Sequence, residues 1–189
     1  MPNYIDRVSR TPPRWPPVEV ENPERHPDAP EPGTELEPHY DNCFGCGEDV
    51  KGGLHLRTVT GAGKTILSQF TVTDAHQGAP GLAHGGLLAA AFDETLGMTV
   101  GQLLRQPAVT GRLETDFLRP VPVGSTLHIV GQLDGIAGRK VYASAEGRLD
   151  APDGPLALRA RALFVIVDFS HFVEHGSGDP RQRRFDINP

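Results

Sequence analysis

One segment of the sequence has the length and composition of a buried helix. It covers roughly residues 85–100 and is apolar almost all round, including Phe92, Met98 and Val100. A helix without a polar face is normally wrapped by the rest of its own protein. The remaining chain must therefore supply a large apolar surface around a single helix.

The other regular segments alternate apolar and polar residues, which is typical of strands with one buried face. In residues 64–73, for example, Ile66, Phe70 and Val72 share one face. About six such strands are expected, at residues 53–59, 64–73, 109–118, 125–133, 139–149 and 155–169. Several strands around one early helix predict an α+β fold in which an antiparallel sheet packs against that helix.

The two ends of the chain differ from this middle part. Residues 1–38 hold 10 of the 18 prolines, so we expect an extended arm there. This arm is either solvated or, because it carries the single tryptophan, Trp15, packed along a partner subunit. Residues 171–189 are expected to form a polar tail, which leaves one domain at residues 39–170.

Charge and cysteine content exclude several classes of protein. The net charge of -6 would repel nucleic acid. The two cysteines do not make a disulfide framework, and no apolar run has the length of a signal peptide or a membrane span. We expect a soluble, cytoplasmic protein without nucleic-acid or membrane partners.

Asp93 and Glu94 lie inside the apolar helix. Burying a carboxylate there is costly unless it has a partner, has a raised pKa or is used in catalysis. His84, Gly85 and Gly86 precede them at the helix start, where free N–H groups point outward. Glycines there let a ligand carbonyl come close, as in an oxyanion hole. On the residues alone, catalysis and a solvated or subunit-contact role for Asp93 both stay open.

Several motifs together resemble the PaaI-like acyl-CoA thioesterases of the hotdog-fold superfamily. They are His84-Gly85-Gly86, Asp93 nine residues after His84, Gly97, and the upstream NCFGCGEDVKGGLHLR. The resemblance covers about residues 42–168 and implies a sheet wrapped around a long central helix. It also implies a homodimer or dimer of dimers with active sites at the subunit interface, acting on an acyl-CoA, or on acyl carrier protein, without a cofactor or metal.

The resemblance assigns roles to individual residues. The N–H of Gly85 polarises the thioester carbonyl, Asp93 is the general base or nucleophile, and Thr110 helps to place the attacking water. His84 mainly steadies the helix start, and both His84 and Gly86 contact the substrate. These roles fit hydrolysis of a thioester, whose thiolate leaves readily once a carboxylate has activated water.

Two positions near these motifs need their own interpretation. Gly78 stands where one branch of the family has an Asn as a second carbonyl contact, and His76 or Gln77 could substitute for it. This departure points to the branch that works with Asp and Thr alone. We expect Glu94 to face away from the site and to stabilise a neighbouring strand.

Other motifs carry weaker signals. Cys43 and Cys46 form a CxxC pattern that favours a simple turn, with a zinc site completed by His39 or His55 as the alternative. Residues 58–65, TVTGAGKT, nearly match a phosphate loop, but a threonine replaces the first glycine and the flanks resemble strands.

Arg139 and Lys140 begin a predicted strand. They could neutralise the phosphates of a CoA, or they could form a solvated strand edge. Two other functions stay open for the whole chain: an acyl-CoA-binding hotdog protein without catalysis, acting as a sensor or scaffold, and a hydratase of the same fold. Release of thiol, a change in enoyl absorbance, or neither would distinguish the three.

Overall fold

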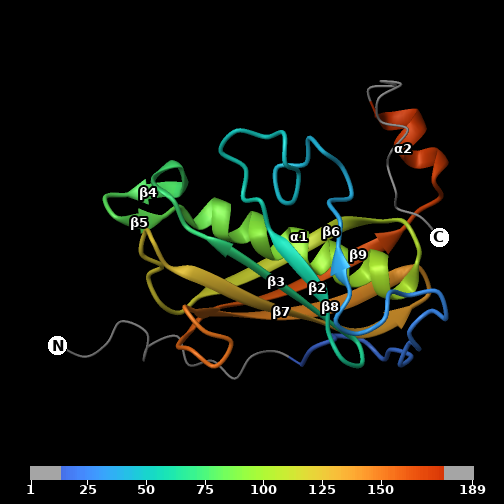
Figure 1. Ribbon diagram of the computed structural model, residues 1–189. Helices are drawn as coiled ribbons and strands as arrows, with labels where there is room; N and C mark the ends of the chain where they lie inside the picture. Colours follow the sequence, from blue (N-terminus) through green and yellow to red (C-terminus); the bar gives the residue numbers. More distant parts are fainter. Residues whose placement is uncertain (1–13, 177–189) are drawn as a thin grey trace.

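The computed structural model describes residues 14–176, in which a curved antiparallel sheet packs against one long helix (Figure 1). The sheet has seven strands in the order β1-β2-β3-β7-β8-β9-β6. Their bounds are β1 Glu35–Leu36, β2 Arg57–Thr60, β3 Thr65–Thr71, β6 Ala108–Phe117, β7 Thr126–Ala137, β8 Lys140–Leu149 and β9 Leu156–Ile166. The helix α1 is Gly85–Leu104. The predicted α+β architecture is therefore confirmed, with seven strands in place of about six.

Smaller elements flank the helix. A 3-10 turn, Asp74–His76, leads into the two-stranded pair β4, Gln77–Ala79, and β5, Leu82–Ala83, just before α1. A short helix α2, Ser170–His175, follows the last strand. Within the described residues, no helix combines the length and the hydropathy needed to cross a membrane.

The core lies between α1 and the sheet. Phe92 and Leu96 of the helix are fully buried against inward-facing strand residues such as Ile66 and Leu127. Burying one such side chain contributes about 1.5–3 kcal/mol. The apolar helix predicted from the sequence is therefore held by its own sheet, and its position relative to the strands is fixed.

Two glycines of the sheet allow α1 to lie this close. A Cβ at Gly131 would come within 2.4 Å of the Thr99 hydroxyl, and one at Gly147 within 2.7 Å of the Phe92 ring. The Thr99 hydroxyl itself donates to the carbonyl of Thr95 inside the helix, at 2.8 Å. The helix therefore keeps its buried hydroxyl satisfied while its backbone approaches the strands.

Strand β6 forms one edge of the sheet and pairs with β9 alone. It is ten residues long, and its outer edge presents unpaired N–H and carbonyl groups. Such an edge is a template for pairing with another strand. The register of β6 shifts between Thr110 and Arg112, and a shift of this kind re-aims side chains near functional sites.

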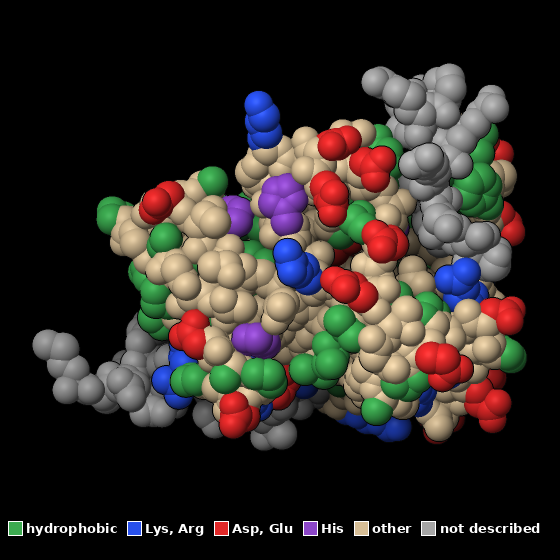
Figure 2. All heavy atoms as spheres, in the orientation of Figure 1, with side chains coloured by type: hydrophobic (Ala, Val, Ile, Leu, Met, Phe, Trp, Pro, Cys, Tyr) green, Lys and Arg blue, Asp and Glu red, His purple; other side chains and the backbone are tan. Residues whose placement is uncertain are grey.

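The loop from residue 37 to 56 joins β1 to β2 and contains no helix or strand. Figure 1 shows it above the sheet, on the same side as α1. Acidic side chains gather over this part of the molecule in Figure 2, and Asp41, Glu48 and Asp49 of the loop are exposed. Loops this long are uncommon inside a compact domain without a functional or structural reason.

The described part of the predicted arm lies against the sheet of its own chain. The indole of Trp15 donates to Asp134 at 2.8 Å and meets the ring of Tyr142 edge-on, with 5.5 Å between ring centres. Glu21 forms a bridge with Ile136 of β7. Residues 1–13 of the predicted arm and 177–189 of the predicted tail lie outside the described residues.

Candidate active site

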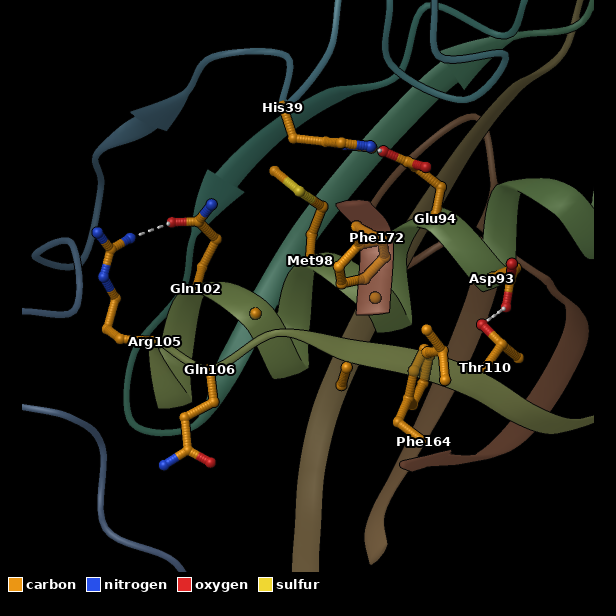
Figure 3. A pocket seen from close by; sticks show the side chains of 14 residues that line it. His39, Asp93, Glu94, Met98, Gln102, Arg105, Gln106, Thr110, Phe164 and Phe172 are labelled. Atoms are coloured by element: carbon orange, nitrogen blue, oxygen red, sulfur yellow. Dashed lines mark hydrogen bonds and ion pairs between the residues drawn. The ribbon is translucent and has the colours of Figure 1, made fainter. Parts of the chain in front are cut away.

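Asp93 of α1 and Thr110 of β6 meet where the helix crosses the edge of the sheet. The Thr110 hydroxyl donates a hydrogen bond to Oδ1 of Asp93 at 2.9 Å (Figure 3). Asp93 is partly buried, whereas Thr110 is exposed in the single chain. The structure therefore brings together two of the three residues to which the resemblance assigns catalytic roles.

The surroundings of Asp93 disfavour its charged form. Burial raises the pKa of this carboxyl above its ordinary value, and the nearby Cys43 sulfur adds to the shift. The hydrogen bond from Thr110 opposes the shift because it stabilises the carboxylate. A carboxylate with a raised pKa is a stronger base than one in water, which is the property a general base needs.

A cavity of about 280 Å³ opens beside this pair. Its walls combine an apolar part with a polar rim that includes both carboxylates of the helix. The lining residues are His39, Asp93, Glu94, Gly97, Met98, Gly101, Gln102, Arg105, Gln106, Ala108, Val109, Thr110, Phe164 and Phe172 (Figure 3). An apolar chain could be buried there with its polar end at Asp93.

The start of α1 is capped by His84. Its Nδ1 accepts a hydrogen bond from the N–H of Gly86 at 2.9 Å. The side chain thus steadies the helix start, and the N–H of Gly86 is engaged with it. Gly85, the first residue of the helix, has an N–H that no carbonyl within the helix can reach, and it lies next to the ring of Phe117.

Gly85 and Asp93 lie at different places along the helix. Eight residues at a rise of 1.5 Å each separate their backbones by about 12 Å. One thioester carbonyl cannot contact both groups of the same chain. Gly85 is also absent from the residues that line the cavity.

The position of Gly78 has no room for a side chain. A Cβ there would come within 2.7 Å of the Cα of His84. The two candidates for replacing the missing Asn have other partners: His76 is buried and accepts from the N–H of Thr73 at 3.1 Å, and Gln77 accepts from the N–H of Gly81 at 2.7 Å.

Arg139 and Lys140 lie at the hairpin between β7 and β8, outside the cavity lining. The register places Lys140 opposite Val165, and Val165 opposite Val109. Both cations are therefore at the end of the sheet that carries Thr110, two strands away from β6.

Glu94 does not behave as the sequence predicts. It turns away from Asp93, as Figure 3 shows, but it lines the same cavity and contacts loop 37–56 rather than a strand. Its Oε1 lies 3.2 Å from Nδ1 of His39, and its Oε2 accepts from Sγ of Cys43 at 3.4 Å. The prediction that Glu94 stabilises a neighbouring strand is therefore wrong.

Sequence reasoning missed the residues that shape the rest of the cavity. In the sequence, Met98 has the pattern of a residue in a helix core, and Phe164 has the pattern of a buried strand residue. Phe172 lies in a region expected to be a polar tail, yet α2 brings it to the cavity wall. No local pattern distinguishes such residues, because the cavity exists only where distant segments meet.

Part of this chain is similar to known thioesterases. Residues 80–153 match the family described as thioesterase superfamily. The acyl-coenzyme A thioesterase THEM4 of Bos taurus is 38% identical over 92 residues, which are 49% of this chain and 37% of that protein. This chain spans less than half the length of the THEM4 proteins that it matches.

Solved structures show the same fold. The PaaI protein from the phenylacetic acid degradation operon of E. coli aligns with a TM-score of 0.56 at 19% identity, over 61% of this chain and 81% of that one. The protein smu.793 from Streptococcus mutans, bound to acetyl CoA, aligns with a TM-score of 0.55 at 18% identity, over 63% and 94%.

An antiparallel sheet around one long helix, shared with these structures, is the hotdog fold. The match over residues 80–153 contains His84, Gly85 and Asp93. The resemblance to the thioesterase superfamily and the hotdog fold, both predicted from the sequence motifs, are therefore confirmed.

Proposed function

We propose that this chain hydrolyses the thioester bond of an acyl-CoA, giving a free acid and CoA. The observation that carries the proposal is the Asp93–Thr110 hydrogen bond at the rim of a partly apolar cavity. The THEM4 relatives are named as acyl-coenzyme A thioesterases, and the neighbour smu.793 binds acetyl CoA. These names support the substrate class, and acyl carrier protein is the alternative carrier.

In this mechanism Asp93 takes a proton from water as the water oxygen attacks the thioester carbonyl carbon. Thr110 holds the carboxylate and the water in position, and an N–H donor stabilises the negative charge that forms on the carbonyl oxygen. The C–S bond then breaks, and the thiolate leaves without the help that an alkoxide would need. Direct attack by Asp93 on the carbonyl is the second version of the same site.

The N–H donor is supplied by Gly85 of a second copy of the chain. Within one chain, the separation of about 12 Å along α1 is too long for Gly85 to share a carbonyl with Asp93. An isologous dimer in which two β6 edge strands pair antiparallel would reverse one helix relative to the other. The Gly85 end of one copy then approaches the Asp93 end of its partner, as the resemblance implies for a homodimer or a dimer of dimers.

The reaction is tested by following free thiol released from short, medium, long and aromatic acyl-CoAs. The parent protein should release thiol from at least one of them, and Asp93→Asn should release it at least about 100-fold more slowly. Asp153→Asn changes an exposed aspartate in a remote turn and should behave as the parent. Tight binding without release would favour the acyl-CoA sensor instead, and loss of enoyl absorbance without release would favour the hydratase.

The shared site is tested with Gly85→Pro. Proline is accepted at the first position of a helix but has no N–H, and His84, with φ -71° and ψ 129°, already has the conformation preferred before proline. Gly85→Pro should therefore lose activity while folding normally, whereas Gly85→Ala keeps the N–H and should stay active.

Subunit exchange then distinguishes a shared site from a site within one chain. In a mixture of Gly85→Pro with Asp93→Asn, half of the dimers contain both variants, and each of these has one intact site of two. About a quarter of the parent activity should return. A mixture that stays inactive after proven exchange of subunits would contradict the shared site.

A further inference from the structure

Four side chains that the proposed hydrolysis does not use converge between loop 37–56 and α1. They form a group that we call the loop cluster: His39, Cys43, Cys46 and Glu94. One ligand atom from each lies within 4.8 Å of the ligand atoms of all the others. The cluster mixes one imidazole, two thiols and one carboxylate, which are the three kinds of side chain that bind zinc.

Three distances within the loop cluster are close to those between neighbouring ligands of a tetrahedral metal ion. Nδ1 of His39 lies 3.2 Å from Sγ of Cys46 and 3.2 Å from Oε1 of Glu94. Sγ of Cys43 lies 3.4 Å from Oε2 of Glu94. Ligands at zinc bond lengths of about 2.0–2.3 Å, arranged tetrahedrally, are separated from one another by roughly 3.3–3.8 Å.

The turn that carries the cysteines is held by hydrogen bonds of its own backbone. Cys43 accepts from the N–H of Gly47 through its carbonyl, at 2.8 Å, and its N–H donates to the carbonyl of Tyr40 at 2.9 Å. The N–H of Gly45 donates to Sγ of Cys43 at 3.3 Å, as suits a sulfur that carries negative charge. The CxxC spacing itself is typical of zinc ligands.

Gly45 explains how Glu94 reaches the cysteines. A Cβ at this position would lie 2.6 Å from Cγ and from Oε2 of Glu94. The carboxylate therefore occupies the space that any other residue would fill. Its Oε1 is buried and lies 3.2 Å from Nδ1 of His39. Two ligands of one metal ion would lie at such a distance, as would the partners of a histidine–carboxylate ion pair.

We propose that the loop cluster binds one Zn²⁺ ion. Two thiolates, a carboxylate and a neutral imidazole give it three negative charges toward a divalent cation, and the exposed acidic residues around the loop add a favourable field (Figure 2). Four protein ligands complete a tetrahedral zinc site and leave no position for substrate, which is typical of structural zinc. The ion fastens loop 37–56 to α1, next to Asp93.

Zinc binding is tested on the reduced, full-length chain after removal of metal with a chelator. Titration with Zn²⁺ against a chromophoric competitor should give one equivalent per chain. Co²⁺ in place of zinc should give tetrahedral absorption bands and a thiolate-to-cobalt charge-transfer band. The Tm should rise when zinc is added, because the ion binds the folded chain. None of these measurements depends on hydrolysis, so this proposal and the proposed function fail separately.

The variants Cys46→Ser and Glu94→Gln should weaken zinc binding by more than about 100-fold, since even the loss of an outer partner costs a metal site 10- to 100-fold. Glu94→Gln keeps the shape of the side chain, so it remains informative if Cys46→Ser fails to fold. His55→Asn is the matched control, because His55 is an exposed histidine of the same loop and asparagine suits its φ of 49°.

Three results would overturn the proposal. The first is a reduced chain that binds less than a tenth of an equivalent of zinc, which would show a metal-free cluster of ion pairs. The second is a Co²⁺ spectrum without the thiolate band. The third is a disulfide between Cys43 and Cys46 that persists in the folded chain and prevents zinc from binding.

Discussion

Asp93 and Glu94 are neighbours in the chain, but their side chains lie in two different regions of the molecule. Asp93 points to β6, where a hydroxyl donates to it, and Glu94 points to loop 37–56, where it meets a histidine and a cysteine. One step along a helix turns a side chain by about 100°. Two carboxylates in one apolar helix can therefore serve two regions, one suited to catalysis and the other to holding a loop.

The largest expected effect is a difference in kcat between variants of Asp93 and variants of Glu94. Asp93→Asn should lower kcat by about 100- to 10,000-fold, the range for loss of a general base. Glu94→Gln should keep kcat within about 10-fold of the parent, because it removes no group from the reacting atoms. Steady-state rates on the best acyl-CoA would measure both. Equal losses in the two variants would show that the regions are not separate.

Thr110→Ala should lower kcat by about 10- to 1,000-fold, the usual effect of one hydrogen-bonding group at a reacting site. It should also change the pH profile. Thr110 lowers the pKa of Asp93, so its loss should move the acidic limb of the rate profile to higher pH. Thr110→Ser keeps the hydroxyl and should restore both the rate and the limb. If Thr110→Ala lowers the rate but leaves the acidic limb of the pH profile in place, Thr110 does not contact the catalytic base.

Gly45→Ala tests the other region without changing a candidate ligand. The added methyl group would force Glu94 away from the loop, and we expect a loss of about 1–3 kcal/mol in the free energy of unfolding. Gly101→Ala is the control, since its Cβ would meet open space and should stabilise α1 by about 0.5–1 kcal/mol. Denaturant unfolding of both variants would measure the difference. If Gly45→Ala leaves the free energy of unfolding unchanged, the contact of Glu94 with loop 37–56 does not stabilise the protein.

The smallest effect concerns the stability cost of Asp93. Its folded-state pKa lies above the ordinary value of 3.8, so the charged form favours the unfolded chain. The stability that the neutral form provides is complete below pH 3.8 and is lost as the pH rises through the folded-state pKa. Asp93→Asn should therefore have a higher Tm than the parent at pH 7, and the gap should close in acid. A variant less stable than the parent at pH 7 would contradict this sign.

The sheet and the helix could be predicted from the sequence because each is specified by local periodicity. Strands β3, β7 and β8 begin and end within a few residues of their alternating patterns, and α1 starts where its glycines predict. Strand β1 was missed because two residues within a proline-rich segment carry no period. Helix α1 continues four residues beyond the predicted end at residue 100, because the apolar pattern does not mark where the helix stops.

The site could be predicted only where a motif carries it. Spacing and the resemblance point to Asp93 and Thr110, which the structure brings together, and to Gly85, which lies away from the cavity. His84 is predicted by its place before a helix, which it caps. Glu94 was misplaced because the direction of a helical side chain depends on what covers the helix. The approach of His39 and the two cysteines to that face depends on the path of loop 37–56, which no periodicity describes.

Phe172 forms part of the cavity wall although it lies near the carboxyl-terminal end of the described residues. The segment that matches the superfamily ends at residue 153, whereas Phe164 and Phe172, like His39, lie beyond its limits and still bound the cavity. Part of the cavity wall is therefore encoded outside the matched segment, which itself contains Asp93, Thr110 and most of the lining residues. Exchanging the carboxyl-terminal stretch, which carries Phe164 and Phe172, should change which acyl chains the cavity accepts without replacing Asp93 or Thr110.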